Sequence, residues 1–194
     1  MTHHIIVGGG PAATNAIETI RQSEAELSKI TLISDEPAHS RMALPYWLSG
    51  QIPREQVHTG DSAYFERLQV DTRFGERVES IDPAAKTVQT TGNQSLSYDT
   101  LLLATGSTPL TIPVPGGDLD GVMPQWSLDD VEGSRNLLAD KSSPEVVLVG
   151  AGFIGFIILS SLFKRGCRLT VIEREPHVLP RMLSHPAAGF VERW

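Results

Sequence analysis

The sequence predicts a doubly wound α/β protein that contains two βαβ units, each with a glycine-rich loop. Residues 5–36 combine a buried strand, a glycine loop, a helix with an apolar face and a second strand that runs into acidic residues. Residues 146–175 repeat the same order of features, and a group of short alternating strands lies between the two units. A single glycine pattern is weak evidence, but strand, loop, helix, strand and acid in this order indicate a dinucleotide site.

The first unit begins with a strand over 5–7 that enters the loop Gly8-Gly9-Gly10. Gly8 allows the tight turn, Gly10 lets a pyrophosphate come close to the backbone, and Ala13 lets the helix pack tightly on the strand. Pro11 suits the first helical turn, where its missing N–H has no helical partner. The helix N-terminus then offers N–H groups and a partial positive charge to phosphates.

The second strand of this unit, residues 30–33, is followed by Ser34, Asp35 and Glu36. A carboxylate at this place can accept hydrogen bonds from an adenosine ribose. Ser34 occupies the position that Glu173 has in the second unit, so either Asp35 or Glu36 is expected to bind the ribose.

The middle of the chain is expected to connect the units. Residues 36–53 contain three prolines and read mostly as loop, although 44–48 are apolar. An apolar strand over 101–104 is typical of the centre of a parallel sheet. The remaining expectations are helices over 61–68 and 129–138, a strand over 70–74, an antiparallel meander of strands 78–81, 87–90 and 96–98, and a proline-containing linker over 108–117.

The second unit consists of a strand over 146–149, a loop with Gly150, Gly152 and Gly155, a buried helix that ends at Arg165, and a strand over 168–173. Two dinucleotide sites imply two cofactors, and the natural pair is FAD with NAD. Hydride transfer between these cofactors needs no catalytic side chain, so no catalytic residue is assigned.

Composition narrows the possible partners. The chain has 194 residues, with 16 Lys and Arg against 23 Asp and Glu, so its net charge is −7. This charge disfavours binding to nucleic acid or to an anionic membrane. The single cysteine, Cys167, excludes an intrachain disulfide and reads as a small core residue. The histidines lack metal-ligand spacing, and neither a signal peptide nor a membrane span is expected, so a cytoplasmic location is the default.

The glycine loops, together with Leu103-Ala104-Thr105-Gly106, resemble the FAD-dependent pyridine nucleotide-disulfide oxidoreductase superfamily, especially its NADH oxidase, nitrite reductase and ferredoxin reductase-like branch. The resemblance implies an FAD/NAD(P)-binding Rossmann-like fold of the glutathione reductase type. It assigns residues 1–113 to most of an FAD-binding domain and residues 114–194 to the first half of an NAD(P)-binding domain.

The resemblance also implies roles for individual residues. The FAD pyrophosphate site comprises Gly8, Gly10, Pro11 and Ala13. Arg41, Ala104, Thr105 and Gly106 line the flavin, and Val78 lies near adenine. Two interpretations of Tyr46 and Trp47, covering the flavin and ordinary packing, stay open. The NAD pyrophosphate loop is Gly150, Gly152, Phe153, Ile154 and Gly155, and Glu173 takes the ribose, which favours NAD over NADP although Arg174 tempers that preference.

Departures from the family pattern refine the expected activity. Met42 stands where disulfide reductases have a redox cysteine, and a thioether cannot form a thiolate. Residues 156–158 lack a glutamate common near the nicotinamide, and Trp126 replaces a frequent arginine. The expected activity is hydride transfer from NADH to FAD, followed by direct transfer to oxygen, a quinone or a small redox protein.

The family continues well beyond the equivalent of Trp194, with the rest of both domains and a C-terminal interface domain that usually holds the dimer contacts. The sequence therefore reads as a C-terminally truncated fragment. A second hypothesis is a non-catalytic remnant that binds FAD without turnover.

Overall fold

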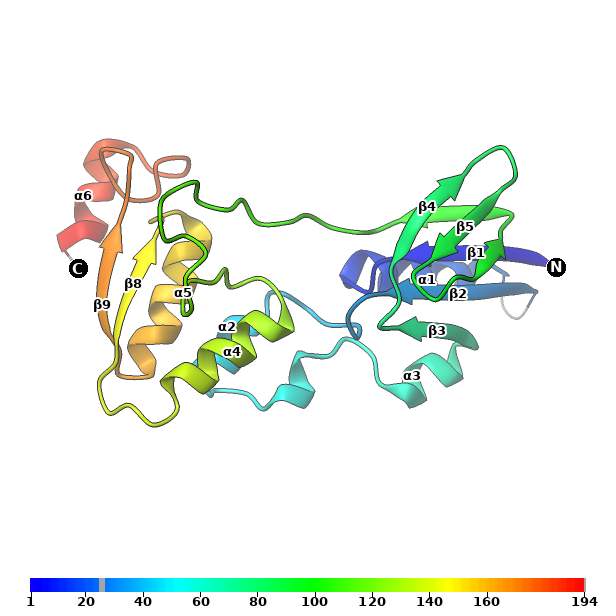
Figure 1. The fold of residues 1–194 in the computed structure, drawn as a ribbon, viewed down its shortest axis with the longest axis horizontal. Coiled ribbons are helices and arrows are strands. Elements are labelled where there is room, and N and C mark those ends of the chain that lie inside the picture. The colour runs from blue at the N-terminus through cyan, green and yellow to red at the C-terminus, as the bar shows by residue number, and fades with distance from the viewer. Residues whose placement is uncertain (25–26, 194) are drawn as a thin grey trace. The chain divides into compact units, whose positions relative to one another are not determined.

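The computed structural model describes residues 1–24 and 27–193. These residues divide into two compact units, one within 1–43 and 54–110 and the other within 44–53 and 111–193 (Figure 1). The first unit ends at Leu110, three residues before the predicted domain boundary. That boundary, 1–113 against 114–194, stays a prediction.

The first unit is built on a parallel sheet of four strands: β1 (Thr2–Val7), β2 (Ser28–Ser34), β3 (Val70–Phe74) and β7 (Thr100–Leu103). Their order is β3-β2-β1-β7, and Ile5 of β1 pairs with Thr31 on one side and Leu101 on the other. The glycine loop after β1 therefore leaves the carboxyl edge of the sheet between two neighbouring strands.

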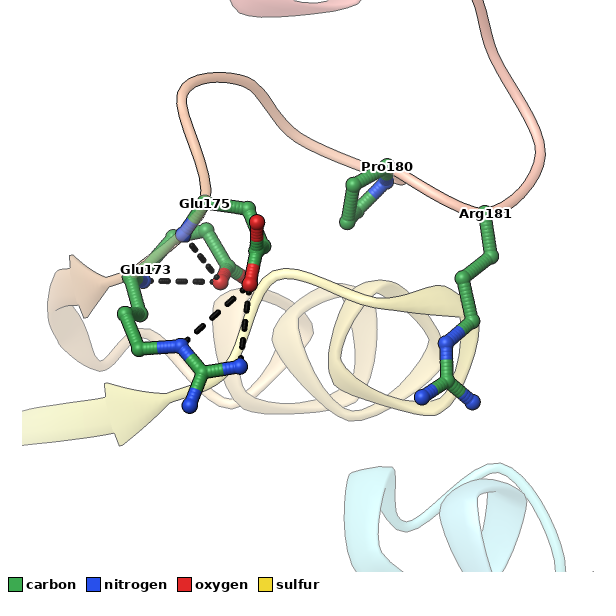
Figure 2. A pocket seen from close by; sticks show the side chains of 5 residues that line it. Glu173, Glu175, Pro180 and Arg181 are labelled. Atoms are coloured by element: carbon green, nitrogen blue, oxygen red, sulfur yellow. Dashed lines mark hydrogen bonds and ion pairs between the residues drawn. The ribbon is translucent and has the colours of Figure 1, made fainter.

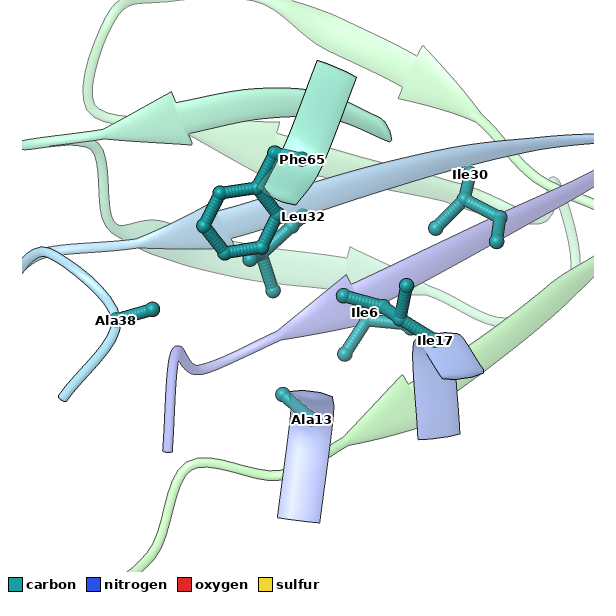
Figure 3. Close-up of a cluster of buried hydrophobic side chains, with 7 residues drawn as sticks. All are labelled: Ile6, Ala13, Ile17, Ile30, Leu32, Ala38 and Phe65. Carbon is teal, nitrogen blue, oxygen red and sulfur yellow. The ribbon is translucent and has the colours of Figure 1, made fainter. Parts of the chain in front are cut away.

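One face of this sheet is covered by α1 (Pro11–Glu24) and α3 (Ser62–Arg67). Asp61 caps α3 by accepting a hydrogen bond from the Tyr64 N–H at 2.8 Å. Figure 3 shows the resulting core, in which side chains of both helices meet those of β1 and β2. Its buried members are Ile6, Ala13, Ile17, Ile30, Leu32, Ala38 and Phe65. The predicted apolar face of α1 is thus confirmed at Ala13 and Ile17.

The predicted antiparallel meander is confirmed as β4 (Val78–Asp82), β5 (Thr87–Thr90) and β6 (Ser95–Ser97). Val88 of β5 is fully buried and packs with Ile5, Val7 and Ile33 from the sheet. The meander therefore covers the sheet face opposite to that of α1. A short 3₁₀ helix, η1 (Arg54–Val57), also belongs to this unit.

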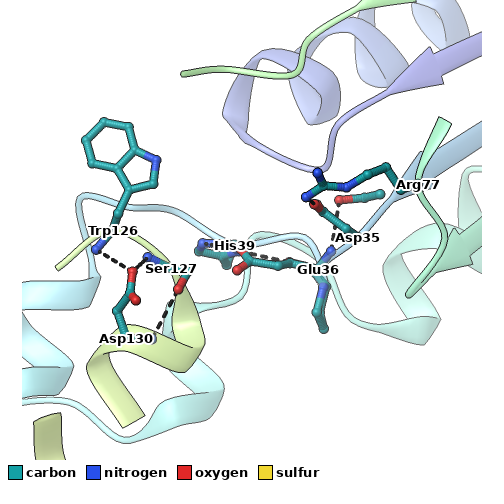
Figure 4. A network of polar contacts seen from close by, with 9 residues as sticks. Asp35, Glu36, His39, Arg77, Trp126, Ser127 and Asp130 are labelled. Atoms are coloured by element: carbon teal, nitrogen blue, oxygen red, sulfur yellow. Dashed lines mark hydrogen bonds and ion pairs between the residues drawn. The ribbon is translucent and has the colours of Figure 1, made fainter. Parts of the chain in front are cut away.

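The second unit contains the parallel pair β8 (Glu145–Val149) and β9 (Arg168–Ile172), joined by α5 (Phe153–Lys164). Helices α2 (Leu44–Ser49), α4 (Leu128–Leu138) and α6 (His185–Arg193) complete it. A capping box starts α4, because the Ser127 and Asp130 side chains and backbone N–H groups bond reciprocally (Figure 4).

Three expectations about these elements were wrong. Residues 44–49 are helical, because Pro45 fits a first helical turn and Gly50 at φ +78° ends the helix. Strand β7 is the last strand of the described sheet rather than a central one, and Leu103 is 57% exposed. Helix α5 is only partly buried: Ile158 and Leu162 are covered, but Ile154 is 55% exposed because packing covers one face.

Candidate functional site

The first glycine loop is held closed by its neighbours. Gly8 has φ +104°, and its N–H donates to the Ile33 carbonyl at 2.8 Å. A Cβ on Gly8 would come within 3.0 Å of the Ala104 carbonyl. An L side chain is therefore excluded twice, by backbone conformation and by the segment after β7.

Gly10 has the opposite environment. A Cβ built on it meets no atom within 4 Å, so the backbone faces open space. Helix α1 starts at the next residue, and a 14-residue helix presents N–H groups and partial positive charge at this end. The space beside Gly10 can accept an anionic group, and a side chain there would fill it.

The two acidic candidates after β2 have different partners. Asp35 forms a 2.6 Å ion pair with Arg77, and both side chains are largely exposed (Figure 4). Glu36 lies 3.4 Å from Nε2 of the buried His39, whose Nδ1 donates to the Pro37 carbonyl at 2.9 Å. The structure thus keeps both carboxylates as candidates for a ribose, one at the surface and one half-buried.

Several residues assigned by resemblance to the flavin meet around the end of β7. Ala104 donates its N–H to the Val7 carbonyl at 2.8 Å, and Thr105 follows against Gly8. A Cβ on Gly106 would lie 2.9 Å from Nη1 of Arg41, so these two predicted residues are neighbours. Val78, the first residue of β4, is partly buried against the core that the sheet shares with the meander.

The second glycine loop repeats the geometry of the first. Gly150 has φ +102° and donates its N–H to the Ile172 carbonyl at 2.8 Å. Gly152 caps α5 and, like Gly10, has open space where a Cβ would be. A Cβ on Gly155 would come within 3.0 Å of the Gly150 carbonyl, so this glycine allows helix and loop to pack.

Glu173 is fixed at the carboxyl end of β9 by three backbone N–H groups. Ala151 donates to Oε2 at 2.6 Å, and Arg174 and Glu175 donate to Oε1 at 2.7 and 2.9 Å. These bonds, that of Glu175 first and that of Ala151 second, lower the pKa of the Glu173 carboxyl. Glu173 therefore stays ionised and is joined directly to the glycine loop.

A cavity of about 410 Å³ opens beside this carboxylate (Figure 2). In Figure 2, Pro180 and Arg181 lie across from Glu173 and Glu175. The lining residues are Glu173, Arg174, Glu175, Pro180 and Arg181. The cavity is thus polar, with two acidic and two basic side chains.

Phe153 and Ile154, at the start of α5, are 56% and 55% exposed. Phe153 also lines a cavity of about 380 Å³ with Tyr46 of α2 and Phe156 of α5. Trp47 differs from Tyr46, since it is 4% exposed and belongs to the packing of this unit. Aromatic side chains therefore lie at the N-terminal end of α5, the helix that follows the second glycine loop.

The two loops correspond residue by residue. Gly8 and Gly150 bond to Ile33 and Ile172, so Ser34 and Glu173 are equivalent positions. This arrangement, a glycine loop between two parallel strands that leads into a helix, is the geometry of dinucleotide-binding folds. Comparison with known proteins agrees, because the family model for pyridine nucleotide-disulphide oxidoreductases matches residues 2–193. The chain belongs to this family.

Individual relatives support the assignment. The chain is 32% identical over 198 residues to an NADH oxidase of Methanocaldococcus jannaschii, with 98% of this chain and 44% of the relative covered. It is 33% identical over 183 residues to the ferredoxin–NAD(+) reductase component of a Paraburkholderia xenovorans biphenyl dioxygenase system, covering 93% and 44%. The structure of an NAD-dependent persulfide reductase from A. fulgidus superposes with a TM-score of 0.90 at 30% identity, covering 99% of this chain and 37% of that chain.

This chain spans less than half the length of the curated relatives that it matches. The fold is an FAD/NAD(P)-binding Rossmann-like fold, as the sequence predicts. Among the described residues, no group of His, Cys, Asp and Glu could hold a metal ion, and no helix could cross a membrane.

Sequence reasoning did not identify four participants in these sites. Arg77 pairs with Asp35, His39 contacts Glu36, and the Ala151 N–H binds Glu173. Glu175, which bonds to Glu173 through its N–H, is the fourth. The sequence feature that could have pointed to Ala151 and Glu175 is the equivalence of the two loops. Arg77 and His39, the partners of Asp35 and Glu36, lie in segments whose contacts no motif specifies.

Proposed function

We propose that this chain is the nucleotide-binding part of an FAD-dependent NAD(P)H oxidoreductase. The observation that carries the proposal is the occurrence of two equivalent open glycine loops, at Gly10 and Gly152, in one member of this family. In this proposal the first loop holds FAD and the second holds NADH. When bound, FAD accepts a hydride from NADH.

The residues of the first unit fit a flavin dinucleotide. Open space at Gly10 and the N-terminus of α1 suit a pyrophosphate, and Arg41 beside Gly106 can lie along a flavin ring. Asp35 or Glu36 accepts hydrogen bonds from the ribose. The full set is Gly8, Gly10, Pro11, Ala13, Asp35, Glu36, Arg41, Val78, Ala104, Thr105 and Gly106.

The residues of the second unit fit a nicotinamide dinucleotide. Gly150, Gly152 and Gly155 shape the pyrophosphate loop, with Phe153 and Ile154 at the start of α5. The ionised Glu173 accepts hydrogen bonds from a ribose and repels a 2′-phosphate. NADH is therefore the proposed donor, in preference to NADPH.

The proposal includes direct transfer from the flavin to an acceptor, without a cysteine relay. Met42 is 77% exposed and carries a thioether, which has no thiolate form. Cys167 lies in the other unit, is 7% exposed, and has a pKa raised by burial. The acceptor is oxygen, a quinone or a small redox protein. The name of the Paraburkholderia relative, a ferredoxin reductase component, supports the last class.

Anaerobic reduction tests the proposal. The purified chain is loaded with FAD, and its visible absorption spectrum is followed after addition of NADH. We expect the flavin band to bleach, and Met42→Ala to bleach at a rate within about twofold of the parent because no sulfur takes part. A bound flavin that NADH leaves oxidised would contradict hydride transfer in this chain.

A further inference from the structure

We propose that Glu175 is a specificity-determining residue that disfavours NADPH at the second glycine loop. It does so by holding the Arg174 guanidinium and by placing a second carboxylate beside the ribose acid. This inference rests on the proposed function, because it assumes that the adenosine ribose of NADH binds at Glu173.

The segment after β9 fixes Glu175 close to Glu173. The Glu175 N–H donates to Oε1 of Glu173 at 2.9 Å, so the backbone of Glu175 is tied to the ribose acid (Figure 2). Its side chain then turns to Arg174. Oε1 of Glu175 accepts from Nη2 at 2.9 Å and from Nε at 3.2 Å of that guanidinium.

A 2′-phosphate needs a cation where NADH presents a hydroxyl, and Arg174 follows Glu173 directly in the chain. Arginine binds phosphate through paired N–H donors, and two of those of Arg174 are already directed at Glu175. While Arg174 stays on this carboxylate, its Nε–Nη2 edge is not available to the phosphate. The carboxylate also repels the ligand. Glu175 therefore acts against NADPH in two ways.

The size of the effect follows from exposure. The Arg174 and Glu175 side chains are 91% and 43% exposed, so their pair is screened by solvent. An exposed pair of this kind changes an equilibrium constant by up to about fivefold, and removal of the repelling charge adds a similar factor. In this proposal Glu173 contributes most of the preference for NADH over NADPH, and Glu175 contributes a smaller part.

The experiment is calorimetric titration of the full chain with two probes, ADP-ribose and 2′-phospho-ADP-ribose. For Glu175→Gln we expect 2′-phospho-ADP-ribose to bind about five- to tenfold more tightly, with ADP-ribose changed by less than about twofold. The double variant Glu175→Gln/Arg174→Gln should keep only the part of this gain that comes from removing the repelling carboxylate, because the cation released by the first change is removed by the second.

Glu145→Gln is the matched control. It removes one negative charge from an exposed pair with Arg168, at the opposite end of the same two strands. An equal gain in this control would overturn the proposal, because the effect would then come from net charge. Retention of the whole gain in the double variant would also overturn it, because Arg174 would then take no part, and would point to Arg181.

The remaining outcomes separate this inference from the proposed function. If ADP-ribose binds the parent chain and Glu175→Gln gains nothing for the phosphorylated probe, the role of Glu175 is wrong and the NADH site stands. If ADP-ribose does not bind the parent chain, both fail. Unchanged ADP-ribose binding by Glu175→Gln shows that the variant is folded.

Discussion

At the scale of single residues, the glycines of one loop have two different tasks. Gly8 lies at φ +104° against the Ala104 carbonyl, so it is required for the fold itself. Gly10 faces open space, so it is required only when a ligand is present. The sequence pattern places both glycines in one motif and does not separate these tasks.

Alanine substitutions should separate them. Gly8→Ala should destabilise the first unit by about 2–3 kcal/mol, because the new Cβ is strained and meets backbone. Gly10→Ala should change stability by less than about 1 kcal/mol and weaken FAD binding by about tenfold or more. Urea unfolding and FAD titration measure the two effects. Equal loss of stability in both variants would contradict the assignment.

The Glu173 carboxylate predicts a pH dependence of the second unit. Its pKa is lowered in the folded state by the backbone N–H groups of Glu175 and Ala151. It therefore stabilises the fold above its unfolded pKa of about 4.3, and this contribution is lost as pH falls through the lower folded pKa. Stability should rise with pH across this window.

Glu173→Gln should reduce that rise, because the amide has no proton to gain. The measurement is the urea midpoint of unfolding at several pH values from neutral to about pH 3. Glu145→Gln, on the exposed end of β8, is the control and should keep the acid dependence of the parent. Identical curves for Glu173→Gln and the parent chain would show that the three hydrogen bonds do not stabilise the charged form.

At the scale of elements, α2 shows how two arginines hold a short helix. Leu44, Trp47 and Leu48 are buried, and the carbonyl groups at its C-terminal end accept from arginine side chains. Arg165 donates to the Leu48 carbonyl at 3.0 Å, and Arg135 donates to that of Trp47. Burial, followed by the charge of Arg165, lowers the pKa of Arg135.

Arg165→Ala should destabilise the second unit by about 1 kcal/mol, because a charge-assisted hydrogen bond to a half-buried helix end is lost. Lys164→Ala is the control, since its Nζ donates to the exposed Gln51 side chain at 3.0 Å, and the change should cost less than about 0.5 kcal/mol. Thermal unfolding compares them. A larger loss for Lys164→Ala would contradict this account of α2.

Helix α5 allows a second comparison between identical side chains. Ile158 is 4% exposed and Ile154 is 55% exposed. Ile158→Ala should cost about 2–4 kcal/mol through lost burial and a cavity, whereas Ile154→Ala should cost less than about 1 kcal/mol. Urea unfolding distinguishes the two. Similar costs would mean that the exposed face of α5 is covered in solution.

At the scale of the whole molecule, local sequence patterns predicted the fold class and most of its elements. The glycine loops, the apolar periodicity of α1 and the turns of the meander each predict an element that the structure contains. Helix α2 was not predicted, because the three prolines between residues 36 and 53 indicated a loop. Pro45, which suits a first helical turn, and Gly50, which suits a helix end, were the opposing indications. The exposure of β7 and α5 was missed because an apolar run does not say how many of its faces are covered.

The candidate sites were predictable to the extent that they are continuous in sequence. Gly10, Gly152 and Glu173 are candidates from local motifs, and their binding roles stay predictions. The structure gives the two glycines open space and Glu173 three backbone N–H partners. The choice between Asp35 and Glu36 could not be predicted from the sequence. It depends on Arg77 and on the buried His39, which tertiary packing brings next to these two carboxylates. Electron acceptors are recognised by surfaces and leave no comparable motif.

We propose that one chain binds two different dinucleotides at two separate loops. Native mass spectrometry of the chain with FAD and ADP-ribose together tests this double occupancy. We expect one FAD and one ADP-ribose on the same chain, with Gly10→Ala losing FAD and retaining ADP-ribose. Binding of only one ligand at a time, or loss of both in that variant, would contradict the account.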